Sequence, residues 1–167
     1  MKNRNSLTLV IIVALFLSTA VAQKSTRHLL SAEELKSVVP VEFFFRGQKA
    51  PVQLRNSAGF QTEGGKILLA ALVDASGYAT AIQQKYQGIL ITETKLMIGD
   101  AELAPGEYGF GFSTNSFVVM NVANEDQLSV PFQTDAELKR PIPLKMLENG
   151  SSYKLYAGKK WVQLKTE

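Results

Sequence analysis

The stretch that decides the fold is GEYGFGFSTNSFVVMNV, residues 106–122. Aromatic side chains occupy every second position of its first part, at Tyr108, Phe110 and Phe112. A period of two is the period of a β-strand. Residues 114–115 then suit a tight turn, and the apolar residues that follow return as a second strand. The stretch therefore predicts an antiparallel β-hairpin.

The two faces of the first strand of this hairpin have different side chains. Its glycines do not form a phosphate-binding loop, because such a loop lies between a strand and a helix. We expect the bare face at Gly109 and Gly111 to pack closely against another element or to bend. The face of Tyr108, Phe110 and Phe112 either belongs to the core or lines an apolar pocket. Aromatics on one strand face favour the core, so we expect at least two of the three to be buried.

Similar short segments, separated by turn signals, run through the chain from residue 41 onward. An unbroken apolar run at 67–73 indicates a strand that is covered on both faces. We expect strands at 41–46, 51–55, 67–73, 89–93, 95–98, 107–113, 116–122, 127–132, 152–157 and 160–165. Residues 78–87 form either a short helix or an ordered loop. The pattern predicts an all-β fold, an antiparallel β-sandwich, with a closed β-barrel as the alternative.

Helical signals are few. Ser31 and Glu34 have capping-box spacing, which predicts a short N-terminal helix that ends before Pro40. The same spacing recurs at residues 134–137 and predicts little more than one turn, because prolines follow at 141 and 143. The sandwich therefore carries one short N-terminal helix and one or two short helical turns.

The first 22 residues have the pattern of a signal peptide. A basic start precedes an apolar run at 7–17, and the small residues Ala20 and Ala22 precede Gln23. The run is too short to span a bilayer, which takes ~20 residues. We therefore expect cleavage before Gln23 and a periplasmic or secreted protein without a membrane span.

The remaining chain divides into a flexible leader, residues 23–30, and a single β-rich domain, residues 31–167. The absence of cysteine excludes thiol nucleophiles, disulfides and cysteine-ligated metals. The only histidine, His28, excludes a multi-histidine metal site. It lies in the expected leader, without a partner to orient it, so we expect it to be dispensable and expect no catalytic triad, metal or cofactor.

Charge argues against nucleic-acid binding. From Gln23 onward the chain has 16 basic and 15 acidic residues, a net charge of +1, whereas nucleic-acid binding needs a concentrated basic face. The distribution is nevertheless uneven, with −7 over residues 93–137 and +5 over residues 138–167. These regions either neutralise each other across strands or form a surface that orients a partner.

Three consecutive phenylalanines, Phe43, Phe44 and Phe45, mark one candidate binding surface. Alternation along a strand points Phe44 away from its two neighbours. We expect a covering element, the helix of residues 31–39, on the second face. An exposed aromatic docking patch is the alternative.

A second candidate surface lies near the C-terminus. Tyr156 shares a strand face with Lys154, and Trp161 shares one with Gln163 and Lys165. Aromatics among lysines on neighbouring strands are typical of a glycan- or peptide-binding surface, or of an aromatic lid held by lysine stems.

The segments LAPGEY (103–108) and YKLYAGKKWV (153–162) resemble exported bacterial β-rich domains of unknown function, over about residues 88–165. The resemblance implies only an exported, sandwich-like domain. Our leading hypothesis is an exported, non-catalytic binding or structural module with a protein or glycan partner in the cell envelope. The alternatives are a periplasmic carrier of a small apolar ligand and a two-carboxylate hydrolase. The acids available for such a hydrolase are Asp74, Glu93, Asp100, Glu102 and Glu107.

Overall fold

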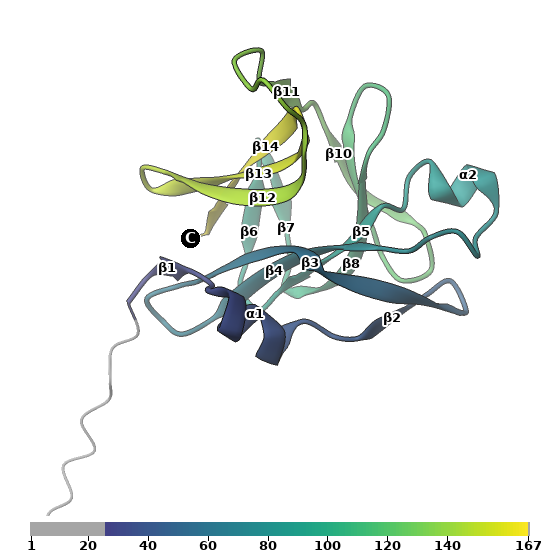
Figure 1. Ribbon diagram of the computed structural model, residues 1–167, viewed down its shortest axis with the longest axis horizontal. Helices are drawn as coiled ribbons and strands as arrows, with labels where there is room; N and C mark the ends of the chain where they lie inside the picture. The colour runs from purple at the N-terminus through teal and green to yellow at the C-terminus, as the bar shows by residue number, and fades with distance from the viewer. Residues whose placement is uncertain (1–25, 167) are drawn as a thin grey trace, which may run out of the picture.

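The computed structural model describes residues 26–166 and forms two antiparallel sheets (Figure 1). The expected signal peptide and its cleavage position lie outside these residues. The larger sheet consists of β1 (His28–Leu29), β2 (Glu42–Phe45), β3 (Gln48–Gln61), β4 (Ile67–Val73), β5 (Gly88–Thr92), β8 (Gly106–Phe112), β9 (Phe117–Met120) and β10 (Asp126–Val130). The smaller sheet consists of β6 (Leu96–Ile98), β7 (Ala101–Leu103), β11 (Gln133–Thr134), β12 (Ile142–Asn149), β13 (Ser152–Gly158) and β14 (Lys160–Thr166).

The strand order confirms the all-β sandwich. The larger sheet runs β1-β3-β4-β5-β8-β9-β10, with β2 added to β3, and the smaller runs β12-β13-β14-β6-β7, with β11 added to β14. Over residues 26–166 the two sheets stay separate, so the closed barrel offered as the alternative does not form. The hairpin predicted within residues 106–122 forms from β8 and β9, which pair with Phe112 opposite Phe117.

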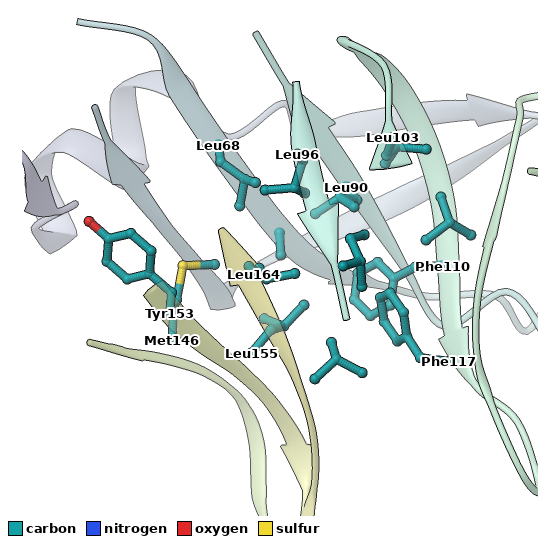
Figure 2. Close-up of a cluster of buried hydrophobic side chains, with 14 of the residues drawn as sticks. Leu68, Leu90, Leu96, Leu103, Phe110, Phe117, Met146, Tyr153, Leu155 and Leu164 are labelled. Carbon is teal, nitrogen blue, oxygen red and sulfur yellow. The ribbon is translucent and has the colours of Figure 1, made fainter. Parts of the chain in front are cut away.

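The inner core lies between the two sheets (Figure 2). Phe110 and Phe117 contribute adjacent rings from the larger sheet, with centroids 5.5 Å apart. Leu155 and Leu164 face them from the smaller sheet and are fully buried. At one end the ring of Tyr153 stacks on that of Phe60, with centroids 3.8 Å apart. Burial of these rings and aliphatic chains is the main force that holds the sheets together.

A second, outer core covers the opposite face of the larger sheet. It includes Phe43, Phe45, Ala71, Tyr86 and Met120. The β2–β3 hairpin and the segment of residues 74–87 close over it, and the Phe45 and Tyr86 rings stack at 3.9 Å. Strand β4 contributes side chains to both cores, so the prediction that residues 67–73 are covered on both faces is confirmed.

The glycines of β8 make this outer core possible. A Cβ at Gly109 would lie 2.7 Å from the Phe45 ring, and one at Gly111 would lie 1.9 Å from the Lys85 carbonyl oxygen. Both distances are shorter than van der Waals contact. The expectation that the bare face of β8 packs closely against another element is therefore confirmed.

Two helices form. Helix α1 (Ala32–Val38) begins with the predicted capping box: the Ser31 hydroxyl accepts from the Glu34 N–H at 3.3 Å, and the Glu34 carboxylate accepts from the Ser31 N–H at 2.8 Å. Helix α2 (Thr80–Gln83) lies within the segment that the sequence left as helix or loop. Before α1, residues 28–29 were expected in a flexible leader, but they form β1, which pairs with β3.

The second capping-box prediction, at residues 134–137, is wrong. Thr134 belongs to β11 and pairs with Lys160, so it cannot begin a helix. The Asp135 carboxylate instead accepts from the N–H groups of Glu137 and Leu138 at 3.0 and 3.2 Å, which forms a local turn. Strand β12 then follows directly, although the prolines at 141 and 143 gave no strand signal.

Candidate functional site

The three consecutive phenylalanines separate by face. Phe43 and Phe45 are buried in the outer core, whereas Phe44 is 59% exposed. The expectation that the N-terminal helix covers the second face is wrong, because α1 leaves Phe44 open to solvent. The alternative, an exposed aromatic, is what the structure has. An ion pair between Glu42 and Lys49 lies on the same hairpin.

The aromatic face of β8 is mainly core. Phe110 is fully buried and Phe112 is 6% exposed, which confirms that at least two of the three rings are buried. Tyr108 is half-buried, and its hydroxyl donates to the Ala104 carbonyl oxygen at 3.0 Å. Only Phe112 also lines a surface hollow, at the end of the strand.

That hollow, of about 580 Å³, lies at one end of the sandwich between the segment after β4 and the β13–β14 turn. Its polar side chains are engaged within the protein. The Gln87 side chain both donates to the Phe112 carbonyl oxygen and accepts from the Phe112 N–H. Lys160 donates to the Ser113 carbonyl oxygen at 2.9 Å, and Gln53 donates to the Val73 carbonyl oxygen at 3.1 Å. These groups stabilise the end of the sandwich rather than face a ligand.

Three of the five acids considered for catalysis, Asp74, Glu93 and Glu102, make structural contacts. The Asp74 carboxylate accepts from the hydroxyl and from the N–H of Ser76, and these hydrogen bonds lower the pKa of Asp74 and close a turn. Glu93 accepts from the Ile67 N–H at 2.8 Å, and Glu102 pairs with Lys95 at 3.2 Å. Within residues 26–166 no three histidine, cysteine or acidic side chains cluster as metal ligands would.

The two aromatics of the C-terminal strands have different surroundings. Tyr156 is buried, and its hydroxyl donates to the Asp135 carboxylate at 3.0 Å, so it is not available at the surface. Trp161 is half-buried on the outer face of the smaller sheet. The Lys154 ammonium lies 4.2 Å from the centroid of its ring. This contact is the lysine packing that the sequence offered as one of two interpretations.

The indole of Trp161 also forms one wall of a second pocket, of about 420 Å³. On the flank of β14 opposite β13, β11 pairs with Trp161, and β6 pairs only from Leu164 onward. Val162 and Gln163 are therefore left between the two short strands, and the pocket opens at this break in the sheet. We call it the Trp161 pocket.

Local sequence explains why the flank of β14 stays open. Pro131, just before β11, has no N–H and cannot extend the hydrogen-bonded ladder. On the other side, Gly99 turns the chain out of β6 with a positive φ of 56°, and its N–H donates to the Gln163 carbonyl oxygen at 3.1 Å. Asp100 follows this glycine and stands at the rim of the pocket.

Polar side chains at the rim are available to a ligand. Asp100, Gln133 and Gln163 line the Trp161 pocket and are exposed. Over the residues that the structure describes, their side chains have no hydrogen-bond partner, nor does the indole N–H of Trp161. The pocket thus offers a carboxylate acceptor, two amides that both donate and accept, and an aromatic wall. Its volume falls within the roughly 300–1,000 Å³ of small-molecule sites.

Sequence reasoning found part of this site. It singled out Trp161 by its place among lysines, and it considered Asp100 only as a catalytic acid. It placed Gln163 on the strand face of Trp161 without making it a site residue, and it missed Gln133, which meets Trp161 only through the pairing of β11 with β14. Pro131 is the local signal that could have shown the break before β11, but the strand expected at 127–132 ran through it, whereas β10 ends at Val130.

Comparisons with known proteins do not assign a family. The scan of protein-family models finds no match, and the searches of curated proteins and of solved structures find none either. Among residues 26–166, neither helix has the length and apolar composition needed to cross a membrane.

Proposed function

We propose that this chain is an exported, non-catalytic β-sandwich module that binds a partner in the cell envelope through the Trp161 pocket. The observation that carries the proposal is the pocket itself, where an aromatic wall adjoins polar side chains that the protein does not use internally. The larger hollow lacks this property, because its polar groups are occupied by the protein's own backbone.

The N-terminal sequence supports export. Residues 1–22 have the basic, apolar and small-residue pattern of a signal peptide. The mass of the exported protein tests this directly, since cleavage before Gln23 gives one expected N-terminus. An intact Met1 or Lys2 start on exported protein would overturn this part of the proposal.

The position of the single histidine supports a non-catalytic role for the protein. His28 lies in β1 of the larger sheet, where its ring bonds the Thr26 carbonyl oxygen at 2.8 Å and the Glu34 carboxylate at 2.9 Å. Both ring nitrogens are thus engaged in local structure, at the N-terminal cap of α1. Asp74, Glu93 and Glu102 likewise make local structural contacts.

Binding can be tested with the protein's own fluorescence. Trp161 is the only tryptophan of the chain, so its emission reports on this pocket alone. We expect envelope extracts of the source cell to change the emission of the mature protein in a saturable way. Asp100→Asn should weaken this response, whereas Phe44→Ser, which alters the exposed aromatic on β2, should leave it unchanged. A response lost only in Phe44→Ser would move the binding site to the β2–β3 hairpin.

A further inference from the structure

We propose that the Trp161 pocket binds a single neutral sugar ring of a glycan, with the indole against the C–H face of the ring and Asp100 accepting from its hydroxyls. This inference rests on the proposed function, because it names the ligand of the same pocket. The size of the gap, the charge of its lining and the neighbours of Trp161 on the two flanks of β14 favour this ligand.

The length of the gap limits the shape of the ligand. Two residues of β14, Val162 and Gln163, lie between its pairs with β11 and with β6, and the Gln163 carbonyl oxygen already accepts from the Gly99 N–H. A strand rises about 3.3 Å per residue, so the gap is about 7 Å long. One pyranose ring fits this length. An extended peptide that paired with β14 would need a longer free edge and would meet β6 or β11.

The charge of the lining favours a neutral ligand. The residues around the pocket include one carboxylate, that of Asp100, and no lysine or arginine. A phosphate or a uronate would therefore meet a like charge without a cation in the lining to offset it. Sugar hydroxyls both donate and accept, as do the amides of Gln133 and Gln163, and a carboxylate accepts from two adjacent hydroxyls at once.

The two flanks of β14 at Trp161 have different neighbours. Lys154 reaches the indole from β13, whereas Gln133 of β11 and Asp100 of the β6–β7 turn line the pocket on the opposite flank of β14. The contact of the Lys154 ammonium with the ring holds the indole in one orientation from the side of β13. The electron-rich ring is then left to meet the polarised C–H groups of a sugar on the pocket side. Val130 and Val162, which belong to the inner core, also line the pocket and add apolar surface to it.

A panel of neutral hexose and N-acetylhexosamine oligosaccharides tests the inference on the mature protein. We expect at least one to shift the Trp161 emission and the NMR signals of the indole and of the Gln133 side-chain amide. Asp100→Asn and Trp161→Ala should each weaken this binding at least tenfold. The matched control is Asp74→Asn, which changes an acid on a distant turn and should not alter the affinity. Asp100 is exposed, so its variant keeps the fold even if Trp161→Ala does not.

Treatment of the envelope extract separates this inference from the proposed function. Periodate, which cleaves vicinal diols, together with glycosidases, which hydrolyse N-acetylhexosamine links that carry no such diol, should abolish the extract's effect on Trp161, whereas protease digestion should preserve it. Loss on protease digestion alone would leave a binding module but overturn the sugar ligand. Preference for uronate oligosaccharides over neutral ones would overturn it as well. If neither the envelope extract nor any sugar of the panel changes the emission of Trp161, both the proposed function and this inference are overturned.

Discussion

The hydroxyl of Tyr86 is buried in the outer core without a hydrogen-bond partner among the described residues. Burial also raises the pKa of Tyr86 well above the ordinary tyrosine value, because a phenolate there would lose its water. An unpaired buried hydroxyl costs free energy, so we predict that Tyr86→Phe raises the free energy of unfolding by about 1 kcal/mol. Urea denaturation measures this change.

The neighbouring Tyr78 provides the control for that prediction. Its hydroxyl donates to the carbonyl oxygens of Phe45 and Gln48, at 3.0 Å each, and so ties the β2–β3 turn to the segment before α2. Tyr78→Phe should therefore lower the free energy of unfolding by about 1 kcal/mol. Equal losses in the two variants would mean that the Tyr86 hydroxyl has a partner, such as a buried water.

The contact between His28 and Glu34 makes the stability of the junction between β1 and α1 depend on pH. The hydrogen bond to the Thr26 carbonyl is the main cause that raises the pKa of His28, and the one to Glu34 adds to it. The pKa of Glu34 is lowered to about 2, mainly by the Ser31 N–H and also by His28. The contribution of Glu34 is complete above pH 4.5 and is lost as the pH falls towards about 2. The contribution of protonated His28 is complete below pH 6.5 and is lost as the pH rises through its raised pKa.

We therefore predict that His28→Ala lowers the melting temperature most between pH 4.5 and 6.5 and less in alkaline buffer. The pair is substantially exposed, so the loss should stay below about 1 kcal/mol, as expected of surface changes. Thermal melts of both proteins across this pH range measure the difference. A larger loss, or one that grows as the pH rises, would show that His28 has a structural role beyond this pair.

At the scale of elements, the contact between β8 and the segment before β5 depends on a missing side chain. A Cβ at Gly111 would lie 1.9 Å from the Lys85 carbonyl oxygen, and backbone cannot move aside as a side chain can. We predict that Gly111→Ala lowers the free energy of unfolding by about 3 kcal/mol, at the upper end of overpacking costs. The control is Gly77→Ala, since a Cβ there meets nothing within 4 Å. A Gly111→Ala protein that melts with the wild type would show that this segment is not packed on β8.

The elements that sequence predicted well are those whose own side chains dictate their structure. The alternating β8 and the apolar β4 each fill a core, so local pattern and tertiary packing agree. Strand β12 was missed because Pro141 and Pro143 resemble a break, whereas an edge strand tolerates proline. The helix expected at residues 134–137 was wrong because pairing with β14 and the Asp135 turn took its capping groups.

The site was less predictable than the fold, and the reason is again pairing. Alternation alone placed Trp161 on a face with lysines, but its neighbour across the sheet is Gln133, from a strand of two residues. No local pattern specifies so short a strand. The exposure of Phe44 was equally hard to predict, because it depends on where α1 packs. The sequence around α1 does not indicate that position.

At the scale of the whole molecule, the first described residues hold the two sheets together. Arg27 precedes β1 of the larger sheet, yet its Nε donates to the Tyr153 hydroxyl of β13 at 2.7 Å. Its guanidinium also lies 4.4 Å from the centroid of the Tyr153 ring, which stacks in turn on Phe60 of β3. The Arg27 side chain thus joins the sheets at one end of the inner core, where β1 also contacts β12.

We predict that Arg27→Ala lowers the free energy of unfolding by about 2 kcal/mol, because a charged hydrogen bond and a cation–π contact are lost together. Arg27→Lys keeps a cation near the ring but loses the planar fork, so it should fall between wild type and Arg27→Ala. Guanidinium denaturation, followed by tyrosine circular dichroism, measures all three proteins. Since this contact spans both sheets, the variants should keep a single transition with an unchanged slope. A first transition confined to the N-terminal residues would instead show that β1 detaches alone and that the sheets do not depend on Arg27.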